Sequence, residues 1–417
     1  MELNMKKIAF FLYQHNIQEK DLSELLSKSY RLGGSELEFL LVSLFVEQRD
    51  NGIKSYFLTN YEGKLPHHDS YYVQDLDEAC KFCVHNSIKE MIIDIKQFKE
   101  DIIRKYSQKL NFLIWAHNNV GEYLLNLCLI YPCVKKIICV SKSQMDAFKD
   151  HPAVLKTCYI YNVILFKDKD FYRKKITSRN QHNVVYMGCI RPDKGFHALA
   201  KAWPDVIAAV SDAQLYVIGN GQLYGKNVTL GNYGIASREY EDEFMPYLTD
   251  DKGEILSSVH FVGLLGDEKY DVLGMCKVGV PNPTGESETF CISGIEMELM
   301  GCSVTTLKIP VYEETQMNVN YLFDNEEMIS DFIIKRLNDT PDNFDESYDF
   351  VTNRFSLEKS ISRWEQLIKT NDVTYVSTFA RIIRSLKLLY FKYYFLSIVR
   401  VFNFVKYRIG HHILNDR

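Results

Sequence analysis

Several features that identify common protein classes are absent from this sequence. Its 417 residues carry 49 Lys and Arg against 54 Asp and Glu, and the resulting net charge of −5 argues against a nucleic-acid-binding protein. The ten cysteines follow no regular framework, which predicts reduced, cytosolic thiols in a chain of this size. There is no repeat of solenoid period. No secretory signal is visible either, because MELNMKKIAFFLYQ fits a first strand better.

Evidence for a zinc site is also missing. Cys80 and Cys83 form a CxxC pair, but a zinc ion needs two more ligands and no second pair follows.

A glycine-rich turn is missing after the first expected strand, Lys7–Tyr13. Residues 13–21 read YQHNIQEKD, whereas a dinucleotide-dependent oxidoreductase has G-x-G-x-x-G at this place. An oxidoreductase therefore ranks below the other hypotheses.

What the sequence does contain is a regular alternation of apolar runs of strand length with helical patterns. One such helix is expected over Ser35–Gln48, where leucines recur on one face. This alternation predicts an α/β fold with two Rossmann-like, doubly wound parallel sheets whose carboxyl edges face a common cleft. The strands are expected at Lys7–Tyr13, Ser55–Thr59, Phe112–Ala116, Ile137–Val140, Thr157–Tyr161, Val184–Met187, Leu215–Ile218, Val259–Val262, Val278–Pro281 and Ser303–Leu307.

A polar stretch over 166–183, rich in Lys and Asp, reads as a solvated linker between the two units. We therefore expect an N-terminal domain at 1–170 and a second domain at 171–345. A C-terminal helix at 346–372 is expected to return to the first domain.

Residues 373–417 form a basic, aromatic tail. They carry eight Lys or Arg and one acid, Asp416, so that their net charge is +7 and the net charge of residues 1–372 is −12. The run Leu388–Val405 is long enough to span a bilayer, but its basic residues favour a helix on an anionic membrane surface. We expect membrane contact through 374–410, and packing on the body or an oligomer contact are the alternatives.

Two candidate sites lie in the first unit. Gly33 and Gly34 precede a helix, where a backbone can approach an anion closely, although Ser35 as an ordinary helix N-cap is an equally good interpretation. His117 follows a strand in WAHNN, a good position for a ligand, and a structural histidine is the alternative.

Strand-ending loops supply the candidates of the second unit. The loop GCIRPDKG begins at Gly188 and brings Arg191 and Lys194 to a strand-to-helix turn, where cations can neutralise a diphosphate or simply face solvent. Gly219 and Gly221 end a later strand in a short GxG loop, a weak signal alone.

The strongest segment is PNPTGESETFCISGIE. A Pro/Gly-rich loop ends near Thr289, where a helix is expected to begin and to offer its N–H groups to phosphate oxygens. Glu288 ends the loop, and Glu296 lies about two helical turns on, where a carboxylate can bind vicinal hydroxyls. A helix-terminal charge and a surface acid are the simpler interpretations.

Over roughly residues 5–370, these motifs in this order resemble the retaining glycosyltransferases of the GT-B fold, family 4. The second half carries most of the resemblance, with Glu288-x7-Glu296 in register, while GGSE, WAHNN and KKIICVSKSQMDAF match weaker motifs. The resemblance implies transfer of a sugar from a nucleotide-diphosphate sugar to a glycan or lipid-linked acceptor, in surface polysaccharide or glycoconjugate synthesis. It also implies a reaction without an essential metal or other cofactor. The reduced thiols and the basic tail, rather than the resemblance, predict a cytoplasmic protein that is peripheral on the inner face of the membrane.

The resemblance further implies roles for individual residues. Lys194 neutralises the leaving diphosphate, Glu288 lies by the donor sugar with His117 near the reacting carbon, and Glu296 holds the ribose. The remaining donor contacts come from Gly33, Gly34, Gly188, Gly219, Gly221, the Gly263–Leu264 turn at the base, Thr289, Phe290 and Cys291.

One position departs from the family pattern. Cys189 stands where the family often has Arg, and Arg191 two residues later is a candidate replacement. This departure keeps open a non-catalytic GT-B partner subunit of a glycosyltransferase complex.

Overall fold

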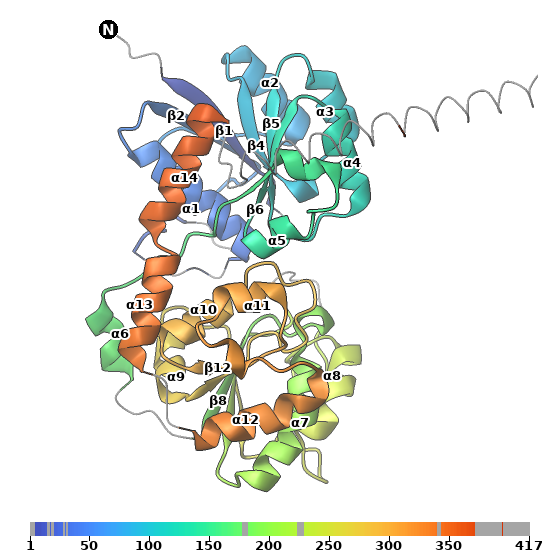
Figure 1. Ribbon diagram of the computed structural model, residues 1–417, viewed down its shortest axis with the longest axis vertical. Coiled ribbons are helices and arrows are strands. Elements are labelled where there is room, and N and C mark those ends of the chain that lie inside the picture. Colours follow the sequence, from blue (N-terminus) through green and yellow to red (C-terminus); the bar gives the residue numbers. More distant parts are fainter. Residues whose placement is uncertain are drawn as a thin grey trace, which may run out of the picture.

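The structure is a computed structural model that describes residues 5–14, 17, 21–27, 30, 32–176, 182–222, 229–339, 343–371 and 394. Two α/β units lie one above the other, with the blue-to-teal first half of the chain in the upper unit (Figure 1). Apart from Tyr394, the tail over 374–410 that is expected to contact a membrane lies outside the described residues.

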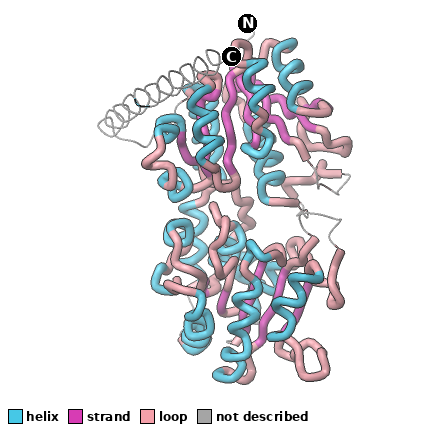
Figure 2. Tube along the Cα trace, turned by 90° about the vertical axis from the view of Figure 1, so that its right-hand side faces the viewer, coloured by secondary structure: helices cyan, strands magenta, loops and turns pink. Residues whose placement is uncertain are grey.

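The N-terminal unit is built on a parallel seven-stranded sheet of order β3-β2-β1-β4-β5-β6-β7. Apart from the edge strand β3, its strands are largely buried because helices cover both faces, as parallel sheets require (Figure 2). The strands are β1 (Lys6–Leu12), β2 (Ile53–Thr59), β3 (Ser70–Tyr72), β4 (Glu90–Asp94), β5 (Asn111–Ala116), β6 (Val134–Cys139) and β7 (Thr157–Tyr159). The helices are α1 (Gly34–Gln48), α2 (Leu76–His85), α3 (Glu100–Tyr106), α4 (Glu122–Ile130) and α5 (Lys142–Asp146).

The second unit has a parallel five-stranded sheet of order β10-β9-β8-β11-β12. Its strands are β8 (Asn183–Met187), β9 (Gln214–Ile218), β10 (Val259–Gly263), β11 (Val278–Gly279) and β12 (Ser303–Val304). Its helices are α7 (Phe196–Ala209), α8 (Arg238–Phe244), α9 (Lys269–Met275), α10 (Ile292–Leu299), α11 (Pro310–Thr315) and α12 (Ile329–Asn338).

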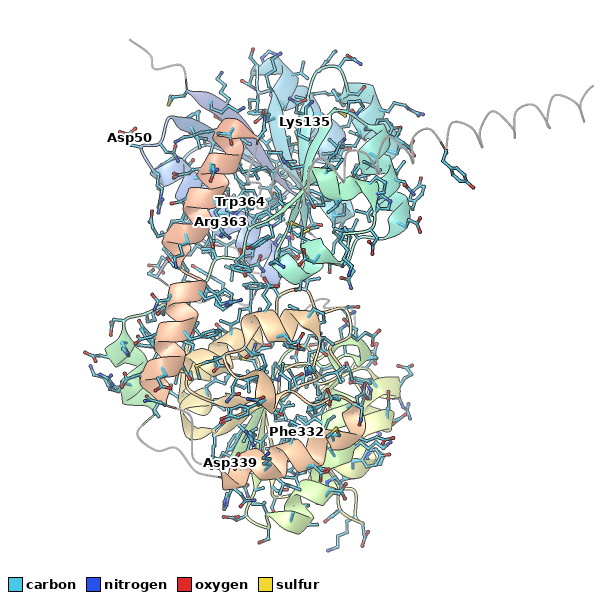
Figure 3. The ribbon with its side chains drawn as sticks, in the orientation of Figure 1. Asp50, Lys135, Phe332, Asp339, Arg363 and Trp364 are labelled. Atoms are coloured by element: carbon cyan, nitrogen blue, oxygen red, sulfur yellow. The ribbon has the colours of Figure 1, made fainter. Side chains whose placement is uncertain are left out.

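The last two described helices connect the units. Helix α13 (Phe344–Arg354) packs on α10, and α14 (Leu357–Thr370) packs on α1, β1 and β2 of the N-terminal unit (Figure 1). Trp364 of α14 is fully buried beside Trp115 and Phe10, with ring centroids 4.5 and 6.3 Å away. Figure 3 labels Trp364 and its neighbour Arg363 where α14 lies along this unit.

The expected fold class is confirmed, and every expected strand overlaps an observed one. Two strands, β3 and β4, were not expected. The segment 166–183 differs from a plain solvated linker because it contains α6 (Lys169–Lys175), whose Tyr172 is buried against Tyr270 of α9. Among the described residues, no helix combines the length and the apolar character needed to cross a membrane.

Candidate functional site

Three glycines lie in a row where β8, β9 and β10 end. The N–H of Gly188 donates to Ile218 O at 3.0 Å, and the N–H of Gly219 donates to Gly263 O at 2.8 Å. A Cβ atom on Gly219, whose φ is +131°, would lie 1.9 Å from Gly188 O. This edge of the sheet therefore presents bare backbone, and the close approach of β8 and β9 requires glycine.

Two more glycines pack the strand-ending loops together. Gly195 has φ +66°, and a Cβ atom there would lie 2.9 Å from the backbone nitrogen of Thr284. Gly221 donates its N–H to Ile235 O at 2.7 Å, and its Cβ atom would lie 2.8 Å from Ala236 Cα. The loop after β8 consequently lies directly against the 281–288 loop.

This packing brings Lys194 and Glu288 together. Lys194 Nζ lies 3.3 Å from Glu288 Oε2, and Asn282 Nδ2 donates to the same oxygen at 3.2 Å. The two charged side chains are 23% and 11% exposed, so the pair is shielded but open to a ligand.

The other carboxylate oxygen of Glu288 accepts hydrogen bonds from backbone N–H groups. Glu288 Oε1 accepts from the N–H groups of Thr289, Phe290 and Cys291, at 3.3, 3.4 and 2.8 Å. Helix α10 begins at Ile292, so the expectation of a start near Thr289 was wrong by three residues. The reason is that Cys291, the N-cap, has a left-handed backbone (φ 55°). In addition, the Glu288 carboxylate binds the amides of residues 289–291, just before the helix.

Three non-glycine residues of the 281–291 loop have a positive φ, which is uncommon. Asn282, Ser287 and Cys291 have φ of 23°, 55° and 55°, and such non-glycine residues cost of the order of 1–3 kcal/mol each. Hydrogen bonds hold the loop, since Tyr312 Oη donates to Asn282 O at 3.1 Å and Asn282 Nδ2 donates to Glu286 O at 3.1 Å. Strain maintained in this way is typical of a binding or catalytic segment.

Glu296 forms a separate pair within the second unit. Its Oε1 lies 2.6 Å from Lys269 Nζ and accepts from Tyr270 Oη at 3.3 Å, and its side chain is 12% exposed. Glu296 is thus not a free surface acid. Lys269 and Tyr270 begin α9, and sequence reasoning missed both because nothing in the spacing ties them to Glu296.

His117 lies where the two units meet. Its Nδ1 is 3.3 Å from Asp94 Oδ2, its side chain is 6% exposed, and within the described chain its buried Nε2 has no hydrogen-bond partner. Thr289 of the second unit donates its hydroxyl to His117 O at 2.8 Å. Asp94 was missed because β4, which it ends, was not expected.

Gly33 and Gly34 also lie at this junction. Gly33 is the N-cap of α1 and Gly34 its first residue, so Ser35 lies inside the helix and the N-cap interpretation of Ser35 was wrong. A Cβ atom on Gly34 would lie 4.0 Å from Ile292 Cδ1 of α10. The start of α1 thus faces the start of α10 across the two units.

The remaining candidates are placed less centrally. Arg191 pairs through Nε with Asp193 Oδ1 at 3.0 Å, and its side chain is 47% exposed. Cys189 is buried. Gly263 ends β10 with φ +74°, and Leu264 next to it is half-buried.

The CxxC pair, Cys80 and Cys83, lies on α2. Cys80 and Cys83 are buried on α2, and burial raises the pKa of both thiols, which disfavours the thiolate that metals bind. Over the residues that the structure describes, no group of three or more His, Cys, Asp or Glu side chains is arranged to hold a metal ion.

Comparison with known proteins identifies the fold. No protein-family model and no curated protein sequence matches the chain. Among solved structures, HepE from Anabaena, in complex with UDP and glucose, matches 88% of this chain and 100% of its own with TM-score 0.57 and 14% identity. Sucrose-phosphate synthase from Thermosynechococcus elongatus matches 88% of this chain and 99% of its own, with TM-score 0.60 and 13% identity. The galactosyltransferase WaaB of the lipopolysaccharide outer core matches 88% and 100% with TM-score 0.55 and 12% identity. The chain therefore has the GT-B fold that these glycosyltransferases share.

Proposed function

We propose that this protein is a retaining glycosyltransferase of the family 4 type. It transfers a sugar from a nucleotide-diphosphate sugar to a glycan or lipid-linked acceptor, in surface polysaccharide or glycoconjugate synthesis. The observation that carries the proposal is the cluster of Lys194, Glu288 and three backbone N–H groups on a strained loop beside His117.

The hard step in such a transfer is departure of the nucleoside diphosphate. The N–H groups of residues 289–291 bind the Glu288 carboxylate in this structure, and phosphate oxygens are acceptors of the same kind. In the proposed mechanism the diphosphate takes these N–H groups, Lys194 neutralises the growing charge, and Glu288 turns to the hydroxyls of the donor sugar.

Nucleotide recognition falls to the carboxyl edge of the second sheet. Glu296 holds the ribose hydroxyls, and Lys269 beside it fixes the carboxylate. The bare backbone at Gly188, Gly219 and Gly221 admits the diphosphate, while the Gly263–Leu264 turn meets the base.

His117 contributes from the N-terminal unit. In the neutral ring whose Nδ1 donates to Asp94, Nε2 accepts a hydrogen bond from a hydroxyl of the donor sugar near the reacting carbon. Gly33 and Gly34 complete the diphosphate site from the same side. Retention of configuration, and a reaction without a metal or other cofactor, follow from the family resemblance.

The similar structures suggest which donors to test first. HepE is in complex with UDP and glucose, and the O-GlcNAc transferase GtfA, with TM-score 0.51, is in complex with UDP and GlcNAc. Uridine diphosphate sugars are therefore the first choice, with GDP and ADP sugars as the comparison.

Nucleotide binding is tested by thermal unfolding with UDP, GDP and ADP. One of them should stabilise the protein by about 2.7 kcal/mol at a hundred times its Kd. The absence of any shift with all three nucleotides contradicts the proposal.

Catalysis is tested by hydrolysis or transfer of the corresponding sugar nucleotide. Lys194→Ala and Glu288→Gln should each lower kcat by about 10²–10³-fold, because both act on charge that develops as the donor breaks. Lys201→Ala is the matched control, an exposed lysine on α7, and should leave kcat unchanged. Equal rates in all three variants exclude Lys194 and Glu288 from the mechanism.

A non-catalytic partner subunit is the second candidate. Its support is Cys189, buried where the family often has arginine, with Arg191 paired to Asp193 instead. Nucleotide binding without turnover by the purified chain, followed by turnover on adding a second glycosyltransferase chain, favours this function.

The membrane proposal rests on the tail. We propose that 374–410 attaches a cytoplasmic protein to anionic lipid on the inner face of the membrane, close to a lipid-linked acceptor. Vesicle flotation after deletion of residues 374–417 tests it, and unchanged lipid binding rejects it.

A further inference from the structure

A second concave site lies between the two chain segments that join the units. The cavity has a volume of about 410 Å³. One wall follows the end of β7, and the other is the junction of α13 and α14. Its walls include Tyr159, Tyr161, Arg354, Lys359, Ser360 and Arg363.

The lining of this cavity is one-sidedly basic. Among the described residues that line it, three are cations and none is a carboxylate. Within the described chain neither Arg354 nor Lys359 forms a salt bridge; Lys359 Nζ donates instead to Asn353 O at 2.6 Å. The guanidinium of Arg363 lies 5.4 Å from the centre of the Tyr159 ring. Three cations in one hollow favour an anionic ligand that offsets their mutual repulsion.

Other cations near the junction are placed differently. Lys169 and Arg173 of α6 pair with Asp345 and Asp349 of α13 at 2.6–3.0 Å. A larger cavity of about 890 Å³, between α7 and α12, mixes Lys201 with Asp205, Glu326 and Glu327. The described residues that line the cavity at the α13–α14 junction include no such carboxylate.

The cavity is also connected to the candidate catalytic loop. The Tyr161 ring lies 5.3 Å from Phe355, between α13 and α14, and 5.7 Å from Phe290. Phe290 supplies one of the N–H groups that Glu288 binds. Tyr161 Oη donates to Glu314 Oε1 of the second unit at 2.7 Å. One aromatic layer therefore separates the cavity from that loop.

We propose that this cavity binds a phosphorylated small molecule or headgroup, and that the bound phosphate fixes the junction of α13 and α14, which carry all three cations. Arg354 and Arg363 suit phosphate because guanidinium groups donate paired hydrogen bonds to its oxygens, and Lys359 adds a point charge. The same phosphate chemistry occurs in a soluble sugar phosphate and in a lipid headgroup. The site is distinct from the donor site at Lys194 and does not depend on the proposed transferase activity.

Calorimetric titration with inorganic pyrophosphate tests the proposal. All titrations use full-length Lys194→Ala protein, which weakens binding at the proposed donor site, and only the change caused by the cavity substitutions is interpreted. The added double substitution Arg354→Gln/Arg363→Gln should weaken binding at least about tenfold, because charge-assisted hydrogen bonds of about 1.5–3 kcal/mol are lost. Lys359→Gln, at an exposed side chain, should weaken it by about fivefold. Lys369→Gln, exposed on the same helix, is the control and should bind as the parent does.

Vesicle co-sedimentation separates the two sources of phosphate. Parent and double variant are compared on phosphatidylcholine vesicles that contain phosphatidic acid or, at equal negative charge, phosphatidylglycerol, so that binding of the 374–410 tail to any anionic surface is accounted for. Unfolding midpoints confirm that both proteins are folded. Loss of binding to the phosphatidic acid vesicles in the double variant identifies a lipid headgroup, and loss with pyrophosphate alone identifies a soluble phosphate. The proposal is overturned if neither probe binds the parent, or if the double variant binds both probes as the parent does.

Discussion

At the scale of single residues, a short distance to the backbone of Gly188 explains why position 219 must be glycine. The Cβ atom of an alanine would lie 1.9 Å from Gly188 O, and φ of +131° is unfavourable for any side chain. We expect Gly219→Ala to lower the free energy of unfolding by more than about 3 kcal/mol, because β8 and β9 must separate. Urea unfolding measures it.

Gly234→Ala is the matched control for this substitution. Gly234 has φ +70° but no atom within 4 Å of an added Cβ. Its substitution should cost only the backbone term, about 1–2 kcal/mol. Equal losses for both variants would show that steric overlap is not what requires glycine at 219.

Glu38 makes stability depend on pH. Burial raises the pKa of this carboxyl from 4.5 to about 8, although Oε2 accepts the N–H of Val163 at 2.8 Å. Between these pH values the folded protein holds a proton that the unfolded chain has lost. Stability should therefore fall as pH rises, by up to about 1.4 kcal/mol per pH unit.

Glu38→Gln removes this titrating group, and its downward contribution to stability between pH 5 and pH 8 should disappear from the urea unfolding profile. Glu36→Gln, in the first turn of the same helix, is the control and should keep the slope. A slope unchanged in Glu38→Gln contradicts the assignment to Glu38.

At the scale of elements, the Glu314 side chain of α11 forms hydrogen bonds to the N-terminal unit. Glu314 accepts the N–H groups of Lys142 and Ser143, at the start of α5, at 2.8 and 2.7 Å, as well as the Tyr161 hydroxyl. We expect Glu314→Ala to separate the units and to enlarge the radius of gyration in small-angle X-ray scattering. Glu313→Ala, at its exposed neighbour, should leave the radius unchanged, and an equal radius in all three proteins refutes the role of Glu314.

The positions of most strands along the chain were predictable, because apolar runs such as those at Phe112–Ala116 and Val184–Met187 alternate with helical patterns. Strand β4 was missed, and with it Asp94, the partner of His117. The start of α10 was misplaced because its position depends on where the Glu288 carboxylate points, a three-dimensional fact. The Lys194–Glu288 contact joins residues 94 positions apart, so motif order predicted both residues but not their distance.

At the scale of the whole molecule, α14 ties the end of the described chain to its beginning. Trp364 is fully buried in the N-terminal unit beside Trp115. Trp364→Ala should cost about 3–5 kcal/mol of unfolding free energy, chiefly in that unit. Calorimetry should show a first unfolding transition, that of the N-terminal unit, whose midpoint temperature is not raised by nucleotide.

The control is Trp203→Ala, in the core of the second unit, where the indole Nε1 donates to Ser258 Oγ at 3.1 Å. It should cost a similar amount but weaken the unit that is proposed to bind nucleotide. If both variants lower the same transition equally, the two units unfold as one and α14 has no separate effect.

The return of α14 also has a consequence for synthesis on the ribosome. The rings of Phe10 and Trp115 pack against Trp364, although β7 of the same unit ends at Tyr159. At about 5–20 residues per second, translation of the roughly 200 intervening residues takes about 10–40 s. During that interval the nascent N-terminal unit exposes an apolar surface that a chaperone can bind, and the second unit is complete before the first.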